Sequence, residues 1–244
     1  CFIGKLGGWG LCGEKRGLLW GRKEARNHMS RFSPYEDNGG TCLAVAGEDF
    51  CVVAADTRMS QGYSILTRKS SKIQELSSSC VLATAGMQSD ACTLRKVLRM
   101  HATTYEHDHH KSINMTAMGQ LMCKTLYSRR FFPYYTFNIV AGIDEDGKGG
   151  VYSYDAIGNG ERTKHACQGS GQALIIPFLD NQVLRGNQDI VENPVLSKED
   201  ALALVKDAFA SAAERDIYTG DFLEICVITE DGVEHLPLEP LRKD

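Results

Sequence analysis

Thr41 is the residue of this sequence whose position best fits a nucleophile. It follows the pair Gly39-Gly40 and opens an apolar stretch, and Asp56 lies fifteen residues further on, two residues before Arg58. A threonine hydroxyl is a weak nucleophile until a neighbouring base accepts its proton, so a catalytic Thr41 needs such a base close to it in the fold. The first question is therefore whether Thr41 can attack a carbonyl group.

Other groups of residues have types that bind ions or phosphates. His107 to His110 hold three histidines, but they end a predicted helix, where the helix dipole also favours histidine. The acidic run Asp144 to Gly147 lacks the spacing and the closing glutamate of a calcium loop and indicates a turn. Neither Gly158–Gly160 nor Gly169–Gly171 completes a nucleotide-binding loop. We expect no metal and no cofactor.

The stretch Gly169-Ser170-Gly171 is of interest for another reason, because it opens a predicted helix. A helix N-terminus presents backbone N–H groups that stabilise an anion or an oxyanion, and the Ser170 hydroxyl would lie beside them.

The composition limits the classes of function. The chain has 244 residues, 43% of them hydrophobic, which is enough for one large domain. Its net charge of −4 and pI near 6.0 give no reason to expect nucleic acid or an anionic membrane as a partner. The nine cysteines stand singly in apolar stretches without CxxC spacing, which is typical of buried, reduced thiols rather than of disulfides or a zinc site.

Residues 1–30 differ from the rest. They contain seven glycines, both tryptophans, and six lysines or arginines against two glutamates, without a sustained period. We expect a disordered or atypical extension at 1–30, rather than a transit peptide, and a single domain at 31–244.

The apolar pattern of residues 31–244 predicts strands, then two helices, then strands, two helices and strands. Ser89 and Ser197 are the expected N-caps of the first and the last helix, with Asp200 completing a capping pattern. The predicted strands are 42–45, 50–53, 63–68, 72–76, 81–87, 134–143, 150–154, 161–167, 223–229 and 233–238, and the helices begin near 89, 113, 172 and 197. Hairpins and strands that are apolar on both faces favour an α+β fold in which two antiparallel sheets lie between two helix layers.

Several segments carry a resemblance to a known family. They are RFSPY (31–35), NGGT (38–41), AGEDF (46–50), DTR (56–58), YSRRFFPYY (127–135), DEDGKGGVYSYD (144–155), FLDNQV (178–183) and SAAERDIYTGD (211–221). With them the chain resembles β-type subunits of the 20S proteasome core, and most closely the non-catalytic kind at the sixth position of the β ring. The resemblance implies the αββα sandwich of the N-terminal-nucleophile hydrolases.

In active members of this family, cleavage after a glycine frees a threonine whose own α-amino group acts as base. That threonine lies sixteen residues before the aspartate that Asp56 matches, and here this position is Gly40. Thr41 is one residue late, and one residue along a strand turns a side chain to the opposite face. We therefore expect no catalytic residue.

The resemblance also implies a vestigial catalytic pocket, formed by Gly40, Asp56, Lys72, Ser170, Asp216 and Thr219. Arg58 and Gly220 match neighbouring structural positions. Without a nucleophile, these polar residues are interpreted as a buried network that is satisfied internally, with Lys72 paired to Asp56.

The expected function is that of a structural subunit in a ring of seven different β chains, in contact with neighbouring β and α subunits and only indirectly with regulatory caps. The expected location is the cytoplasm and the nucleus. Candidate contact segments are 128–135, 184–196 and the tail from 236. The alternatives are an active threonine protease that uses Thr41 and a free-standing binding domain.

Overall fold

The computed structural model describes residues 32–188 and 195–243. The chain divides into two units, Cys1–Pro34 and Tyr35–Asp244, and the second contains all of the helices and strands given below. The extension expected at residues 1–30 lies outside the described residues.

The first sheet joins strands from the two ends of the domain. Its order is β10-β1-β2-β11-β12, with β13 also paired to β11, and every pairing is antiparallel. Its strands are β1 (Thr41–Ala46), β2 (Cys51–Asp56), β10 (His165–Gly169), β11 (Phe222–Thr229), β12 (Gly232–His235) and β13 (Glu239–Pro240).

The second sheet follows chain order, β5-β6-β7-β8-β9, and is also antiparallel. Its strands are β5 (Ile73–Ser77), β6 (Cys80–Gly86), β7 (Thr136–Ile143), β8 (Gly149–Tyr154) and β9 (Gly160–Thr163). A separate two-stranded ribbon consists of β3 (Met59–Gln61) and β4 (Ser64–Thr67).

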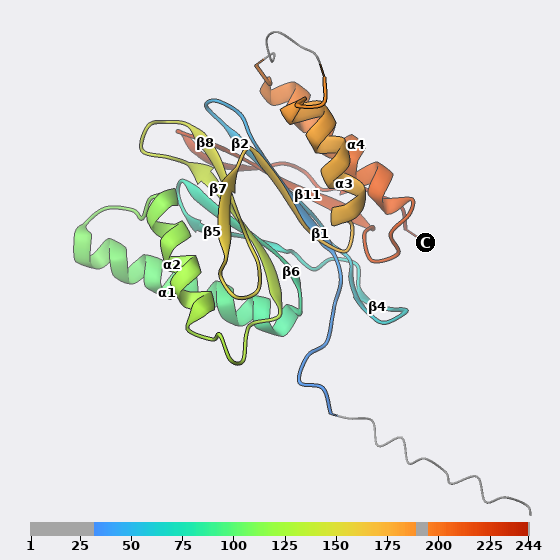
Figure 1. The fold of residues 1–244 in the computed structure, drawn as a ribbon, viewed down its shortest axis with the longest axis horizontal. Coiled ribbons are helices and arrows are strands. Elements are labelled where there is room, and N and C mark those ends of the chain that lie inside the picture. The colour runs from blue at the N-terminus through green and yellow to red at the C-terminus, as the bar shows by residue number, and fades with distance from the viewer. Residues whose placement is uncertain (1–31, 189–194, 244) are drawn as a thin grey trace, which may run out of the picture. The chain divides into compact units, whose positions relative to one another are not determined.

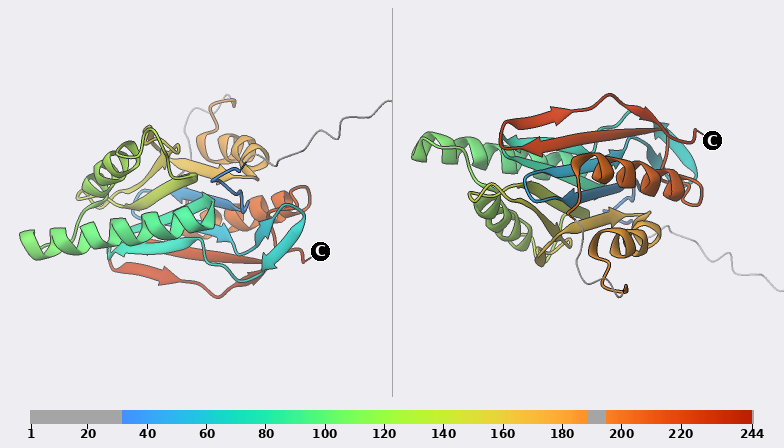
Figure 2. Two further views of the ribbon diagram at one scale, coloured as in Figure 1. Left: turned by 90° about the horizontal axis from the view of Figure 1, so that it is seen from below. Right: turned by 90° about the horizontal axis from the view of Figure 1, so that it is seen from above.

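Helices cover the outer face of each sheet, with α1 and α2 on one side of the strands and α3 and α4 on the other (Figures 1 and 2). The helices are α1 (Gln88–His109), α2 (Met115–Tyr127), α3 (Gln172–Leu179), which continues into a π-helical turn (Asp180–Leu184), and α4 (Lys198–Ala213). The expected αββα sandwich is confirmed.

Strand β1 shows why the strands are apolar on both faces. Cys42 and Ala44 belong to the core between the two sheets, whereas Leu43 and Val45 pack under α3 and α4. Successive side chains of a strand point to opposite faces, so a strand in the middle of this sandwich needs apolar residues at every position.

The single strand expected at 161–167 is wrong. The chain forms β9 up to Thr163 and β10 from His165, and the two strands lie in different sheets. The backbone carbonyl of Lys164, between them, already accepts a hydrogen bond from Ala46 N–H of the first sheet. The polar first half of the segment suits an exposed edge strand, whereas the apolar second half is buried.

The expected N-cap of α1 is also wrong, because the helix begins at Gln88, before Ser89. The Gln88 N–H donates to the side-chain oxygen of Asn38 at 2.9 Å. A residue distant in sequence thus satisfies a free N–H group of the first turn, which local sequence patterns cannot indicate. The N-cap at Ser197 is confirmed, since its hydroxyl accepts from Asp200 N–H.

The C-terminal tail packs on its own domain. Leu236 and Leu241 lie against the core under α3 and α4, and the Arg242 carbonyl accepts hydrogen bonds from Asp221 N–H and from the Arg58 guanidinium. Leu236 and Leu241 thus need no adjacent subunit to explain them, whereas Leu238 is exposed, and contact of the tail with a neighbour stays a prediction.

We predict that removing residues 239–244 lowers the free energy of unfolding by about 2–4 kcal/mol, because buried donors of Arg58 and Asp221 lose their acceptor. Urea unfolding should show a lower midpoint with an unchanged slope. Removing Asp244 alone is the control and should leave the midpoint in place. Equal midpoints for the two truncations would show that the tail does not stabilise the domain.

Candidate functional site

The six residues of the expected pocket lie together at one end of the first sheet. Gly40 precedes β1, Asp56 ends β2 and Ser170 follows β10, and the antiparallel pairing of β1 with both neighbours brings these positions to the same end. Lys72 comes from the residues before β5. Asp216 and Thr219 come from the loop between α4 and β11.

Lys72 is buried and its hydrogen-bonding capacity is fully used. Its ammonium donates to the Asp56 carbonyl at 2.8 Å, to Asp56 Oδ1 at 3.1 Å and to the Arg58 carbonyl at 2.7 Å. An ammonium group has three N–H donors, so none remains for a substrate or a nucleophile.

Asp56 is fully buried and accepts several hydrogen bonds. Besides Lys72, its carboxylate accepts from the backbone N–H groups of Thr41 at 2.7 Å, Arg58 at 3.2 Å and Gly220 at 3.4 Å. Burial raises the pKa of Asp56, while the Lys72 charge and the N–H groups act in the opposite direction. The carboxylate therefore orients Lys72 and the strand that begins at Thr41.

Gly40 leaves no room for a side chain. Its φ is +87°, in the region that favours glycine, and a Cβ placed on it would lie 2.1 Å from Lys72 Cε and 2.7 Å from Lys72 Nζ. The aliphatic stem of Lys72 thus fills the volume that a nucleophile at position 40 would occupy.

Thr41 is completely buried, and its hydroxyl is engaged on the helix side of the sheet. Its Oγ1 accepts from Gly171 N–H at 2.8 Å and lies 2.7 Å from Thr219 Oγ1. Thr219 donates its own proton to Asp216 Oδ2 at 2.6 Å, so Thr41 must be the donor to Thr219. The hydroxyl therefore serves as a cap for α3, whose N-cap, Gly171, has no side chain.

Replacing Thr41 with valine should lower the free energy of unfolding by about 1–3 kcal/mol, because the shape is kept while Gly171 N–H and Thr219 lose a partner. Thr41→Ser keeps the hydroxyl and is the matched variant. In denaturant titrations, the free energy of unfolding should fall clearly in the valine variant and much less in the serine variant. A serine variant as unstable as the valine variant would contradict the capping role.

The N–H groups of Ser170 and Gly171 at the start of α3 are both occupied by acceptors within the protein. Ser170 N–H donates to the Gly40 carbonyl at 3.0 Å, and Gly171 N–H donates to Thr41. The exposed Ser170 hydroxyl donates to Asp216 at 2.6 Å. The two N–H groups join the start of α3 to Gly40 and Thr41, and the hydroxyl joins it to the loop between α4 and β11.

Cys42 is the next residue that faces the same side as Gly40, and it is no substitute nucleophile. Burial raises the pKa of its thiol to about 12, although Lys72 opposes the shift. At neutral pH the thiol is protonated, and only the thiolate is a strong nucleophile.

Asp221, which the sequence analysis did not select, forms a second buried charge group beside the site. It accepts from Arg58 Nε at 2.8 Å and also pairs with Arg68. Burial alone would raise the pKa of Asp221, but the hydrogen bonds from both arginines hold it below its ordinary value. The φ of Asp221 is +71°, which is uncommon for a residue with a side chain. No local sequence pattern indicates this backbone angle.

The other residues whose types could bind an ion have structural explanations. Among the described residues no group of three or more His, Cys, Asp and Glu side chains is arranged to hold a metal ion. His109 contacts Tyr105 within α1, and Asp144, which follows β7, pairs with Arg162 of β9. In the same part of the chain, no helix is both long and apolar enough to cross a membrane.

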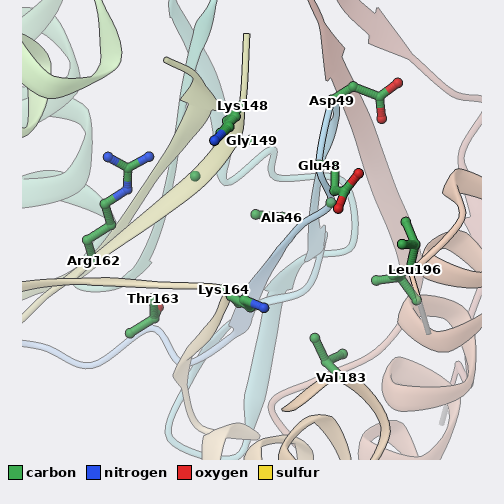
Figure 3. A pocket seen from close by; sticks show the side chains of 13 residues that line it. Ala46, Glu48, Asp49, Lys148, Gly149, Arg162, Thr163, Lys164, Val183 and Leu196 are labelled. Atoms are coloured by element: carbon green, nitrogen blue, oxygen red, sulfur yellow. The ribbon is translucent and has the colours of Figure 1, made fainter. Parts of the chain in front are cut away.

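A hollow of about 760 Å³ lies at the opposite end of β1 from Gly40 (Figure 3). Lys148, Arg162 and Lys164 on one part of its wall and Glu48 and Asp49 on another give it mixed charge, and it contains none of the six residues of the expected pocket. The hollow beside Gly40 is smaller, about 180 Å³.

Comparisons with known proteins agree with this architecture. The sequence model of the family described as "Proteasome subunit" matches residues 36–228. A Petunia hybrida protein named "Proteasome subunit beta type-1" is 53% identical over 222 residues, 88% of this chain and 98% of the relative. Proteins of the same name from Arabidopsis thaliana (52% over 221 residues, 88% and 98%) and Dictyostelium discoideum (55% over 205 residues, 83% and 87%) are similarly close. The chain therefore belongs to the proteasome subunit family and, within it, to the β-type subunits.

Proposed function

We propose that the chain is a non-catalytic β subunit of the proteasome core particle, which forms part of the β ring and of the chamber wall. Its neighbours in this proposal are other β subunits in the ring and α subunits in the adjoining ring, with regulatory caps in indirect contact. The location that goes with it is the cytoplasm and the nucleus, which fluorescence microscopy of the tagged chain would test.

One observation carries the non-catalytic role. The position sixteen residues before Asp56 is Gly40, and the Lys72 stem fills the space where a side chain would stand. Thr41, the nearest hydroxyl in sequence, is buried, and both its proton and a lone pair are used within the protein. A nucleophile needs an exposed reactive atom next to a base, and neither residue supplies one.

The test is to label purified core particles that contain this chain with a threonine-directed covalent inhibitor, such as a peptide epoxyketone, and to measure the intact mass of each subunit. We expect adducts on other β subunits of the same particle, which serve as internal controls, and none on this chain. The Gly40–Thr41 peptide bond should be intact. An adduct on Thr41, together with a mature chain that begins there, would establish the alternative of an active threonine protease.

A native-mass measurement separates the assembly role from that of a free-standing domain. The chain should migrate with α and β partners in a large particle. A chain that is found only as a monomer would overturn the proposal.

A further inference from the structure

An aromatic and basic surface lies at the end of α2 and in the turn that follows. We define the aromatic-basic surface as Tyr127, Arg129, Arg130, Phe131 and Phe132. The exposed fractions of its three rings are 63% for Tyr127, 98% for Phe131 and 58% for Phe132. Single exposed apolar side chains are common on protein surfaces, but several of them next to each other mark a contact site.

The backbone of this surface is fixed by hydrogen bonds. The N–H groups of Arg129, Arg130 and Phe132 donate to carbonyls three residues earlier, at 3.0–3.1 Å. The Tyr35 hydroxyl donates to the Pro133 carbonyl at 2.8 Å. A surface that is already ordered loses little conformational entropy when a partner binds, so more of the contact energy appears as affinity.

Ring contacts also hold the surface and connect it to the candidate site. Phe132 lies 5.5 Å from the ring of Tyr35, Tyr35 lies 5.7 Å from Tyr135, and Tyr135 lies 5.6 Å from Phe137. Phe137 lines the hollow beside Gly40. The aromatic-basic surface is therefore at the same end of the domain as the pocket, where the α2–β7 connection and the segment before β1 lie in Figure 1.

The charge of the surface is of one sign. From Asn114 to Ile143 the sequence contains Lys124, Arg129 and Arg130 but no aspartate or glutamate. Within the described residues, neither Arg129 nor Arg130 takes part in an ion pair with a carboxylate. Arg129 instead lies over the ring of Tyr134 at 5.1 Å, which orients it.

We propose that the aromatic-basic surface is the contact for a neighbouring subunit of the particle, one that presents carboxylates to Arg129 and Arg130 and an apolar pocket to Phe131. Phenylalanine, tyrosine and arginine side chains are enriched at the centres of protein interfaces, and opposite charges select the partner and its orientation. The chain's overall charge of −4 argues against a polyanion such as RNA at this surface. The inference rests on the proposed function, because it takes the partner from the same assembly.

The first experiment places the photo-crosslinking amino acid p-benzoylphenylalanine at position 131 of the full chain and irradiates assembled particles. We expect a crosslink to another subunit, on a peptide that contains aspartate or glutamate. A crosslink only to this chain itself, a crosslink to RNA, or no crosslink in assembled particles would overturn the proposal.

The second experiment measures how well variants enter the particle. Phe131→Ser and Arg130→Glu should each reduce incorporation by about tenfold in competition with the unmodified chain. Met100→Ser and Lys96→Glu, at exposed positions of α1, are the matched controls and should incorporate normally. Reversing the charge of the crosslinked carboxylate in the partner should restore Arg130→Glu.

The outcomes separate this inference from the proposed function. If the unmodified chain does not enter the particle, the proposed function fails. If the unmodified chain enters the particle and the two surface variants enter as well as the α1 controls do, the proposed function stands and this inference is wrong.

Discussion

Replacing Lys72 with methionine should lower the free energy of unfolding by about 3–5 kcal/mol, the range for removing one partner of a buried ion pair. Methionine keeps most of the aliphatic volume beside Gly40 but removes the three N–H donors that Asp56 and the Arg58 carbonyl use. The fully buried Asp56 carboxyl group then has no cation beside it. Chemical denaturation of the purified chain measures the loss.

The loss should depend on pH. Burial already raises the pKa of Asp56 in the folded protein, and removing Lys72 removes the main opposing charge. Between its unfolded and its raised folded pKa, such a carboxyl group binds more protons in the folded than in the unfolded state. The free energy of unfolding therefore falls as pH rises from the unfolded pKa to the folded pKa. The difference in the free energy of unfolding between Lys72→Met and the unmodified chain should therefore be smaller near pH 5 than near pH 8.

Lys96→Met is the control for this experiment, since Lys96 is exposed on α1. Its effect should stay within about 0.5 kcal/mol at both pH values. A Lys72→Met variant that loses no more than this control, or a gap that grows toward low pH, would contradict the ion-pair explanation.

The second large effect is expected for Asp221→Asn, again about 3–5 kcal/mol. Asparagine also tolerates the positive φ at this position, so the change isolates the loss of charge between Arg58 and Arg68. Buried Arg58 would keep the asparagine amide oxygen and the backbone carbonyls of Ile217 and Arg242 as acceptors, but it would have no carboxylate to pair with.

The pH dependence has the opposite sign to that at Lys72. The folded pKa of Asp221 lies below its ordinary value, so its contribution to stability is complete above the unfolded pKa, near 4, and is lost as pH falls through the folded pKa. The difference between Asp221→Asn and the unmodified chain should shrink below about pH 4. Asp207→Asn, an exposed change on α4, is the matched control. A difference that stays constant down to pH 2 would show that Asp221 stabilises the fold by something other than its charge.

Much of the architecture could be predicted from the sequence because it depends on periods of apolar residues. The αββα layers followed from strands that are apolar on both faces and from two pairs of amphipathic helices. The assignment of Gly40 to the position of the nucleophile followed from the resemblance to active proteasome subunits, which implies a spacing of sixteen residues before Asp56.

The details of the candidate site depend on contacts between distant residues, which no local pattern contains. Asn38 caps α1 across fifty residues, and Thr41 caps α3 across 130. The position of the Lys72 stem in the space at Gly40 is a matter of packing, not of composition. The change of sheet at Lys164 was missed because no glycine or proline separates the polar half of 161–167 from its apolar half.

The two sheets differ in how they can form during synthesis. Strands β5 to β9 pair in chain order, so the second sheet is complete once the ribosome has released residues up to Thr163. The β1–β2 hairpin can pair with β10 and β11 only after these strands have been made. Until then its two apolar faces are uncovered. Non-local pairing of this kind is slow and leaves apolar strands open to aggregation. We therefore expect the nascent chain to need protection by a chaperone until β11 has emerged.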